Sequence, residues 1–358
     1  MSLPTIAGDA ATRRNQSKER SMGQAMEGRA GGVWHRWAAW ALRGAGGVAV
    51  MLALAAPAQA QYTKVVVFSD SMSDTYRYYE FTRKTLGKGY PLSPPAMQGR
   101  FCDGPVAVEV LARELKVPLE NYSFSGAQTG YGTLFPGVML GVLTQVSEYV
   151  NKTAAIPTLA TLPIVNRITS RLPLTGRADP KALHVIWSGP DDFYALGGFN
   201  SFTSYTATQN IQRAISSLYA AGARYFLVPQ MPDLSITPRA RQREGDTPGY
   251  IADAKRYSEQ FASVLERGLD TMRALYPNAR IMSFPTMSFL RDEVDKAVAR
   301  GINVKDACHP GGLNLTQFED RPVCPDPQNY LFWDDNHPTA AANEILGVAW
   351  SKAIVYTP

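Results

Sequence analysis

The chain is poor in residues that hold metals. Its 358 residues include three cysteines and four histidines, with no Cys-x-x-Cys pair and no histidine-rich cluster. Zinc sites are built mainly from closely spaced cysteines and histidines. A complete glycine-rich phosphate loop is missing, and so is a Gly-x-Ser-x-Gly turn. These absences argue against a zinc protein, a P-loop nucleotide-binding protein and an α/β-hydrolase with that nucleophile turn. We predict no metal and no cofactor.

Positive charge is scarce outside the first sixty residues. The formal net charge is +5, but residues 1–60 hold seven Arg or Lys and three Asp or Glu, which leaves +1 for residues 61–358. Proteins that bind nucleic acid gather Lys and Arg on one face. We therefore expect no nucleic-acid partner.

Long hydrophobic runs are also rare. The segment Ala45–Ala56 is apolar, follows basic residues and precedes the small-residue site Ala58-Gln59-Ala60, as in an export signal. The run is short for a membrane span. We predict a signal peptide and N-terminal extension in residues 1–60, cleavage near Ala60, and a secreted or periplasmic domain in residues 61–358. A retained anchor is the alternative. No later segment resembles a transmembrane helix, which leaves transient contact with a lipid surface open.

The three cysteines are Cys102, Cys308 and Cys324. Exported proteins can hold disulfides. A bond between Cys308 and Cys324 would close a short loop rich in Gly, Pro and Asn, and we favour it over two free thiols. Cys102 is then unpaired, and we expect it to be buried rather than reactive.

Hydrophobic strand patterns alternate with helical patterns along residues 61–358. This alternation is typical of an α/β domain with a mainly parallel sheet. The predicted strands are Lys64–Phe68, Glu120–Phe124, Leu183–Trp187, Arg224–Val228 and Arg280–Phe284. The predicted helices are Pro105–Lys116, Val138–Asn151, Phe202–Ala221, Tyr250–Leu275, Met287–Ala299 and Thr339–Ile354.

Two predicted loops have unusual compositions. Residues Tyr76–Phe81 are aromatic, and Ile156–Pro180 is rich in Pro and Thr with scattered charges. Either loop could wall a site for an apolar acyl chain. The alternative for each is plain packing against the domain.

Ser71 directly follows the first predicted strand, within Phe68-Ser69-Asp70-Ser71-Met72-Ser73-Asp74. Ligands of open α/β sheets bind beyond the carboxyl ends of the strands, where helix N-termini offer N–H groups. An isolated Asp-Ser pair is ordinary turn chemistry, but the whole segment is much more specific. Ser71 is therefore our candidate nucleophile.

A serine nucleophile needs a base, which is itself oriented by a third group. Asp334 precedes His337 by three residues, so its carboxylate can hold Nδ1 while Nε2 faces the serine. Alone, Asp-x-x-His could equally be a helix cap beside a surface histidine. The other candidates have simpler explanations, because His184 opens a predicted core strand and His309 adjoins a cysteine in a loop.

These segments resemble the GDSL, or SGNH, family of serine esterases and lipases, in particular its secreted bacterial lipases and phospholipid acyltransferases. Plant GDSL lipases are similar too. The resemblance covers most of residues 64–353 and implies a three-layer α/β/α sandwich. The motif around Ser71 matches the first family motif, which carries the nucleophile. Tyr330–Thr339 closely matches the last one, which carries the acid and the base onto Asp334 and His337.

The resemblance also implies donors for an oxyanion. Asn121–Ala127 resembles the second family motif and assigns an oxyanion-hole N–H to Gly126, beside the N–H of Ser71. The third motif, Gly-x-Asn-Asp, is Gly189-Pro190-Asp191-Asp192 here. An ionised carboxylate only accepts hydrogen bonds, so Asp191 would oppose the developing charge. Loss of one such donor costs about 3–4 kcal/mol.

Three explanations of this change are open. Asp191 can be held protonated by a dry site and still donate. Gln128, two residues past Gly126, can replace it. Or the protein is a weak or altered catalyst. A milder departure is Ser69, where the family has glycine.

We thus predict an exported serine esterase or lipase that hydrolyses or transfers acyl groups of lipid or other carboxylic esters through an acyl-enzyme. One alternative is a carbohydrate acetyl esterase or O-acetyltransferase. Another is a weakly active or non-catalytic binding protein with the same fold, which only the change at Asp191 supports.

Overall fold

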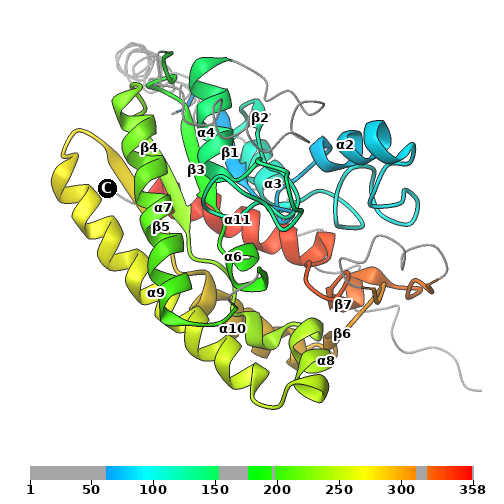
Figure 1. Cartoon of the computed structure of the whole chain (residues 1–358). Coiled ribbons are helices and arrows are strands. Elements are labelled where there is room, and N and C mark those ends of the chain that lie inside the picture. The colour runs from blue at the N-terminus through cyan, green and yellow to red at the C-terminus, as the bar shows by residue number, and fades with distance from the viewer. Residues whose placement is uncertain (1–61, 153–175, 196–197, 312–320, 357–358) are drawn as a thin grey trace, which may run out of the picture. The chain divides into compact units, whose positions relative to one another are not determined.

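Five strands form the central sheet, in the order β2-β1-β3-β4-β5 (Figure 1). The computed structural model describes residues 62–152, 176–195, 198–311 and 321–356, which belong to the unit Ala60–Pro358. The strands are β1 (Val65–Ser69), β2 (Leu119–Asn121), β3 (Leu183–Trp187), β4 (Tyr225–Pro229) and β5 (Arg280–Phe284). All neighbouring pairs are parallel. The carboxyl ends of the five strands therefore meet at one edge of the sheet.

Helices connect and cover these strands. The α-helices in the described ranges are α2 (Arg77–Leu86), α3 (Ala107–Leu115), α4 (Val142–Asn151), α6 (Pro190–Tyr194), α7 (Ser201–Ala220), α8 (Pro238–Asp246), α9 (Tyr250–Leu275), α10 (Thr286–Ala299) and α11 (Ala340–Tyr356). Shorter elements are the 3-10 helices η1 (Leu234–Ile236) and η2 (Pro327–Asn329), and a small parallel sheet of β6 (Asn303–Ala307) and β7 (Tyr330–Phe332). No helix in the described ranges has the length and apolarity to cross a membrane.

The two faces of the sheet bury different clusters. Successive side chains of a strand point to opposite faces. Val66 and Phe68 accordingly pack with buried side chains of α4, α7 and α9, whereas Val65 and Val67 pack with those of α3 and α11. Because both faces are covered, all of β1 is buried. The predicted three-layer α/β/α sandwich is confirmed.

Most predicted elements agree with the structure, but α8 was not predicted, and β2 covers Leu119–Asn121 where Glu120–Phe124 was predicted. Leu183–Trp187, Arg280–Phe284 and Tyr250–Leu275 have the predicted bounds. The aromatic segment Tyr76–Phe81, interpreted as a loop, instead enters α2. The second unusual loop, Ile156–Pro180, lies mostly outside the described residues.

Candidate active site

The turn that carries Ser71 is fixed by Asp70. The N–H groups of Ser73 and Asp74 donate to the carbonyl of Asp70 at 3.1 and 3.0 Å. The N–H of Met72 donates to Asp70 Oδ1 at 3.0 Å. These bonds tighten the chain where β1 ends, so that Ser71, 7% exposed, lies at the carboxyl edge of the sheet.

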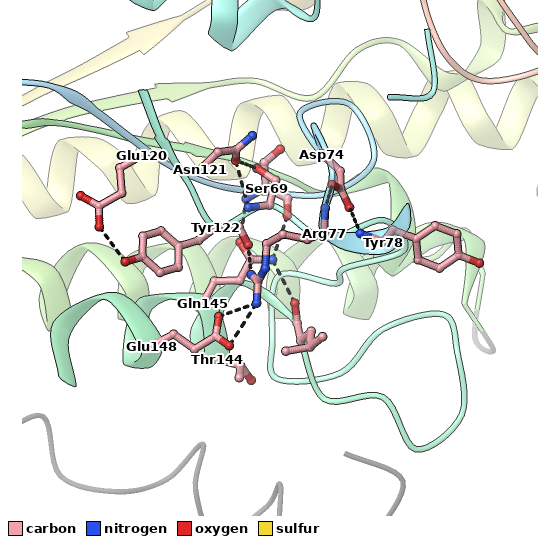
Figure 2. A network of polar contacts seen from close by, with 12 residues as sticks. Ser69, Asp74, Arg77, Tyr78, Glu120, Asn121, Tyr122, Thr144, Gln145 and Glu148 are labelled. Atoms are coloured by element: carbon pink, nitrogen blue, oxygen red, sulfur yellow. Dashed lines mark hydrogen bonds and ion pairs between the residues drawn. The ribbon is translucent and has the colours of Figure 1, made fainter. Parts of the chain in front are cut away.

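Ser69 anchors this turn to the neighbouring elements. Its hydroxyl donates to the carbonyl of Trp187 in β3, which explains how a serine is accommodated where the family has glycine. The carboxamide of Gln145 in α4 bonds both the N–H and the carbonyl of Ser69, each at 2.9 Å (Figure 2). One turn further along α4, Glu148 accepts from the Arg77 guanidinium at 3.0 and 3.1 Å. The ends of β1, β3 and α4 are thereby held together.

Asp74 joins the nucleophile turn to two other segments. Its buried carboxylate accepts from the N–H groups of Arg77 and Tyr78 at the start of α2, at 2.8 and 3.0 Å (Figure 2). It also accepts from the N–H of Ser125 at 2.9 Å, which ties the loop of Gly126 to the turn of the nucleophile. Burial raises the pKa of Asp74 to about 6, and the N–H groups of Ser125, Tyr76 and Tyr78 oppose the rise.

Ser71, His337 and Asp334 form one line of hydrogen bonds. His337 Nε2 lies 2.7 Å from Ser71 Oγ. His337 Nδ1 lies 2.7 and 2.8 Å from the two oxygens of Asp334. All three side chains are buried. The ring of Phe101 lies against the imidazole, with centroids 4.9 Å apart. Folding therefore brings together a hydroxyl, an imidazole and a carboxylate in the order that activates a serine.

A disulfide braces the segment that holds Asp334. Cys308 and Cys324 are bonded, as predicted. The N–H of Cys308 donates to the carbonyl of Phe332 at 3.0 Å, and the next N–H, of His309, donates to that of Trp333 at 2.6 Å. Cys102 is unpaired and buried, also as predicted.

A pocket of about 370 Å³, counted with its open mouth, lies beside Ser71 and His337. Two carboxyl groups line it with them, those of Asp70 and Asp191. They are 1% and 4% exposed. In the described part of the chain, Oδ2 of each is buried and accepts no hydrogen bond.

Electrostatics favour a proton on these carboxyl groups. Burial raises the pKa of Asp191 well above its usual range, and the charges of Asp70 and Asp192 add to the rise, whereas Arg239 opposes it. Burial also raises the pKa of Asp70 to about 7. The Met72 N–H, the His337 imidazole and the Ser188 hydroxyl oppose this rise. Two carboxylates in one dry site do not both ionise readily. A neutral carboxyl group can donate a hydrogen bond, which an ionised one cannot.

Asp192 has a different environment. It accepts hydrogen bonds from the N–H and hydroxyl of Thr129, at 2.9 and 2.8 Å. Burial raises the pKa of Asp192 to about 6, and those two bonds oppose the rise. Asp192 thus ties α6, which carries Asp191, to the segment that follows Gly126.

The two sequence-predicted backbone donors are not engaged elsewhere. Among the described residues, the N–H groups of Ser71 and Gly126 donate no hydrogen bond. Gly126 has φ +78°, and a Cβ there would come within 2.7 Å of Phe135. Gln128 does not line the pocket, and its Oε1 lies near Gly132. The role suggested for Gln128 as a substitute donor stays a prediction.

Sequence reasoning missed the part played by Asp70. The sequence pointed to Asp191 alone. The two carboxyl groups lie 121 positions apart, and only the pairing of β1 with β3 brings their segments together. His184, in contrast, is a buried core residue as expected. Its ring nitrogens bond the carbonyl of Tyr225 and the hydroxyl of Tyr149, and burial lowers the pKa of His184 to about 4.

A hydrogen-bonded serine, histidine and aspartate at the edge of a parallel sheet is an arrangement shared by serine esterases of several folds. A family model described as GDSL-like Lipase/Acylhydrolase matches residues 65–350. The chain belongs to that family, in agreement with the resemblance seen in its motifs.

Several relatives match most of the chain. A phosphatidylcholine-sterol acyltransferase of Aeromonas hydrophila is 24% identical, over 85% of this chain and 82% of its own length. The GDSL esterase/lipase EXL3 of Arabidopsis thaliana is 25% identical, over 79% of this chain and 85% of its own. Among solved structures, Est24, a carbohydrate acetylesterase from Sinorhizobium meliloti, is 15% identical, covers 81% of this chain and 97% of its own, and has a TM-score of 0.41.

Proposed function

We propose that this protein is a serine esterase of carboxylic esters that works through Ser71, His337 and Asp334. The observation that carries the proposal is the unbroken line of hydrogen bonds from the hydroxyl of Ser71 through the imidazole to the carboxylate. Membership of a family of lipases and acylhydrolases supports it.

In the first half of the reaction, Ser71 Oγ attacks the ester carbonyl carbon while its proton passes to His337 Nε2. Asp334 keeps Nδ1–H directed toward itself and stabilises the imidazolium. The tetrahedral intermediate collapses when His337 gives that proton to the leaving alcohol, which leaves an acyl group on Ser71. In the second half, water loses a proton to His337 and attacks the acyl-enzyme, and the acid is released as Ser71 regains its proton. An acceptor alcohol in place of water gives acyl transfer, as the name of the Aeromonas relative suggests.

The negative charge on the carbonyl oxygen needs hydrogen-bond donors. We assign this role to the N–H groups of Ser71 and Gly126, together with the protonated carboxyl group of Asp191. The buried, unpaired Oδ2 of Asp191 in the same pocket supports this assignment. A neutral carboxyl group donates as an amide would, so the change from asparagine need not abolish activity.

We further propose that the enzyme acts after export, in the periplasm or outside the cell. The apolar run before Ala60 supports export, and so does the Cys308–Cys324 disulfide, since such bonds persist in oxidising compartments.

Covalent labelling with a fluorophosphonate probe tests this function. The wild-type protein should label and Ser71→Ala should not. Ser125→Ala is the matched control, because the Ser125 hydroxyl is also buried but has no hydrogen-bond partner in the described part of the chain. Labelling that persists in Ser71→Ala, or that is lost equally in both variants, contradicts the proposal.

A further inference from the structure

The side chain of Gln145 is completely buried where α4 meets the end of β1. Its Oε1 accepts from the N–H of Ser69, and its Nε2 donates to the carbonyl oxygens of Ser69 and Leu140, each at 2.9 Å (Figure 2). A carboxamide has two N–H donors, and both are engaged here. The opposite orientation of the amide would set its oxygen against both carbonyls. The three bonds therefore hold this side chain in one orientation.

The carbonyl of Ser69 joins the two segments that carry the proposed oxyanion donors. Besides the bond from Gln145, it accepts one from the N–H of Phe124 at 3.2 Å. Ser69 lies two residues before Ser71, and Phe124 lies two residues before Gly126. Gln145 thus donates to an oxygen that bonds the backbone of the nucleophile segment to the backbone of the Gly126 segment.

The carbonyl of Leu140 belongs to the loop that runs from Gly126 to α4. The side chain of Leu140 is buried in one cluster with Ala127, the residue after Gly126. The first N–H groups of α4 also donate to carbonyls of this loop, at 2.9 and 3.0 Å. Gln145 therefore bonds the far end of the loop as well as the end of β1 at Ser69.

We propose that Gln145 is a positioning residue that fixes the spacing of the two oxyanion donors, the N–H groups of Ser71 and Gly126. The inference rests on the proposed function. Among the described residues these two N–H groups donate no hydrogen bond, so their places must be set by bonds of their neighbours. An oxyanion hole is effective because its donors are in place before the charge develops. A misplacement of about 1 Å can cost about 10²-fold in rate.

The test compares variants of Gln145 with wild type in the hydrolysis of nitrophenyl acetate. Methionine is an unbranched side chain that fills core space, and it cannot replace the three amide bonds. Gln145→Met should lower kcat by about 10²-fold and leave KM nearly unchanged, because the interaction that it weakens is made in the transition state.

Trifluoroacetone reports on the oxyanion itself. When Ser71 Oγ bonds to its carbonyl carbon, the proton of the hydroxyl passes to His337 and the carbonyl oxygen becomes negative, as in the transition state. Its inhibition constant should therefore rise in Gln145→Met by about the factor by which kcat/KM falls. A role in folding alone would lower the unfolding temperature and leave this constant unchanged.

Gln145→Glu separates the donors of the amide from its acceptor. An ionised carboxylate can accept from the Ser69 N–H, but it sets a negative charge against the carbonyls of Ser69 and Leu140. A protonated carboxyl group has one O–H to donate to them. The kcat of Gln145→Glu relative to wild type should therefore rise as the pH is lowered, and at acid pH it should exceed that of Gln145→Met. If Gln145→Met does not fold, the inhibition constant is measured for Gln145→Glu, and a wild-type value across this pH range would overturn the inference.

His184→Leu is the matched control. His184 is equally buried and also bonds a backbone carbonyl, but it lies near the start of β3, away from the carboxyl edge of the sheet. This variant should lose stability and keep the kcat and the inhibition constant of wild type.

The inference is overturned if Gln145→Met keeps wild-type kcat, if it changes KM alone, or if His184→Leu loses as much turnover. It is also overturned if Gln145→Glu is no more active than Gln145→Met at any pH. A wild-type protein that the fluorophosphonate does not label would instead refute the proposed function itself.

Discussion

Oδ1 of Asp334 accepts hydrogen bonds from both the backbone N–H and the ring Nδ1 of His337, each at 2.8 Å. It also accepts from the N–H of Asn336 at 2.8 Å. The carboxylate therefore fixes the path of the chain and the direction of the imidazole at once. In a site of this kind, the aspartate sets which ring nitrogen carries the proton.

Asp334→Asn should lower kcat by about 10⁴-fold with little change in fold, because a carboxamide favours the wrong imidazole tautomer. The measurement is nitrophenyl ester turnover, with circular dichroism as the check on folding. Asp335→Asn, at the adjacent buried carboxyl group, is the control and should stay within about tenfold of wild type. Similar losses in the two variants would argue that Asp334 has only a structural role.

Asp191→Asn should keep or raise turnover near neutral pH. The pKa of Asp191 is raised by burial and by Asp70 and Asp192, so its carboxyl group donates below that pKa and becomes a negative charge as the pH rises through it. Wild-type activity should therefore fall on the alkaline side. An asparagine amide donates at every pH. The fall of activity on the alkaline side should therefore be absent from this variant. The check is the pH dependence of kcat/KM. A more than tenfold loss in a folded Asp191→Asn would instead give Asp191 a role of its own that an amide cannot fill.

Asp70→Asn should shift the fall of activity at alkaline pH to lower pH. Its asparagine still accepts the hydrogen bond from Met72, but the negative charge that helps to raise the pKa of Asp191 is gone. An alkaline limb that is unchanged in Asp70→Asn would show that the two carboxyl groups titrate independently.

Gly126→Ala should reduce both stability and activity. A residue other than glycine at φ +78° costs about 1–2 kcal/mol, and the new Cβ would also meet Phe135. Displacing this N–H should lower kcat by up to about 10²-fold, as when one oxyanion donor is lost.

Gly137→Ala is the matched control for this strain. Gly137 has φ +81° with nothing near its missing Cβ, so it should lose stability but not turnover. Adding Phe135→Ala to Gly126→Ala should recover part of the activity. If turnover is the same in Gly126→Ala and Gly137→Ala, the Gly126 N–H does not serve the reaction.

Reduction of the Cys308–Cys324 bond should destabilise the protein by about 3 kcal/mol, since the bond closes a loop between residues 16 apart. Thermal unfolding with and without dithiothreitol measures the change. The double variant Cys308→Ser/Cys324→Ser should unfold at the temperature of the reduced wild type, and dithiothreitol should not change that temperature. A wild-type transition that dithiothreitol leaves unchanged would contradict this expectation.

Most of the sheet could be predicted from the sequence because β1, β3 and β4 are buried on both faces. β3 is buried throughout and reads as a continuous hydrophobic run, so its bounds were predicted without error. α2 was missed because its buried side chains, Tyr78 and Thr82, are not aliphatic, and because the Asp74 carboxylate that bonds its first turn precedes it. α8 was missed because it is polar along most of its length.

The site could be predicted only in part. Ser71, Asp334 and His337 stand in recognisable motifs, and their contact agrees with the hydrogen-bonding order expected of them. The shared environment of Asp70 and Asp191 arises from the pairing of β1 with β3 and has no local signal.

The 266 positions between Ser71 and His337 have a consequence for biosynthesis. A ribosome makes the nucleophile long before the base, at about 5–20 residues per second. During that interval the growing polypeptide holds a serine with nothing to activate it. On the proposed function, Ser71 becomes reactive toward esters only after the segment of His337 has been made and has folded against it.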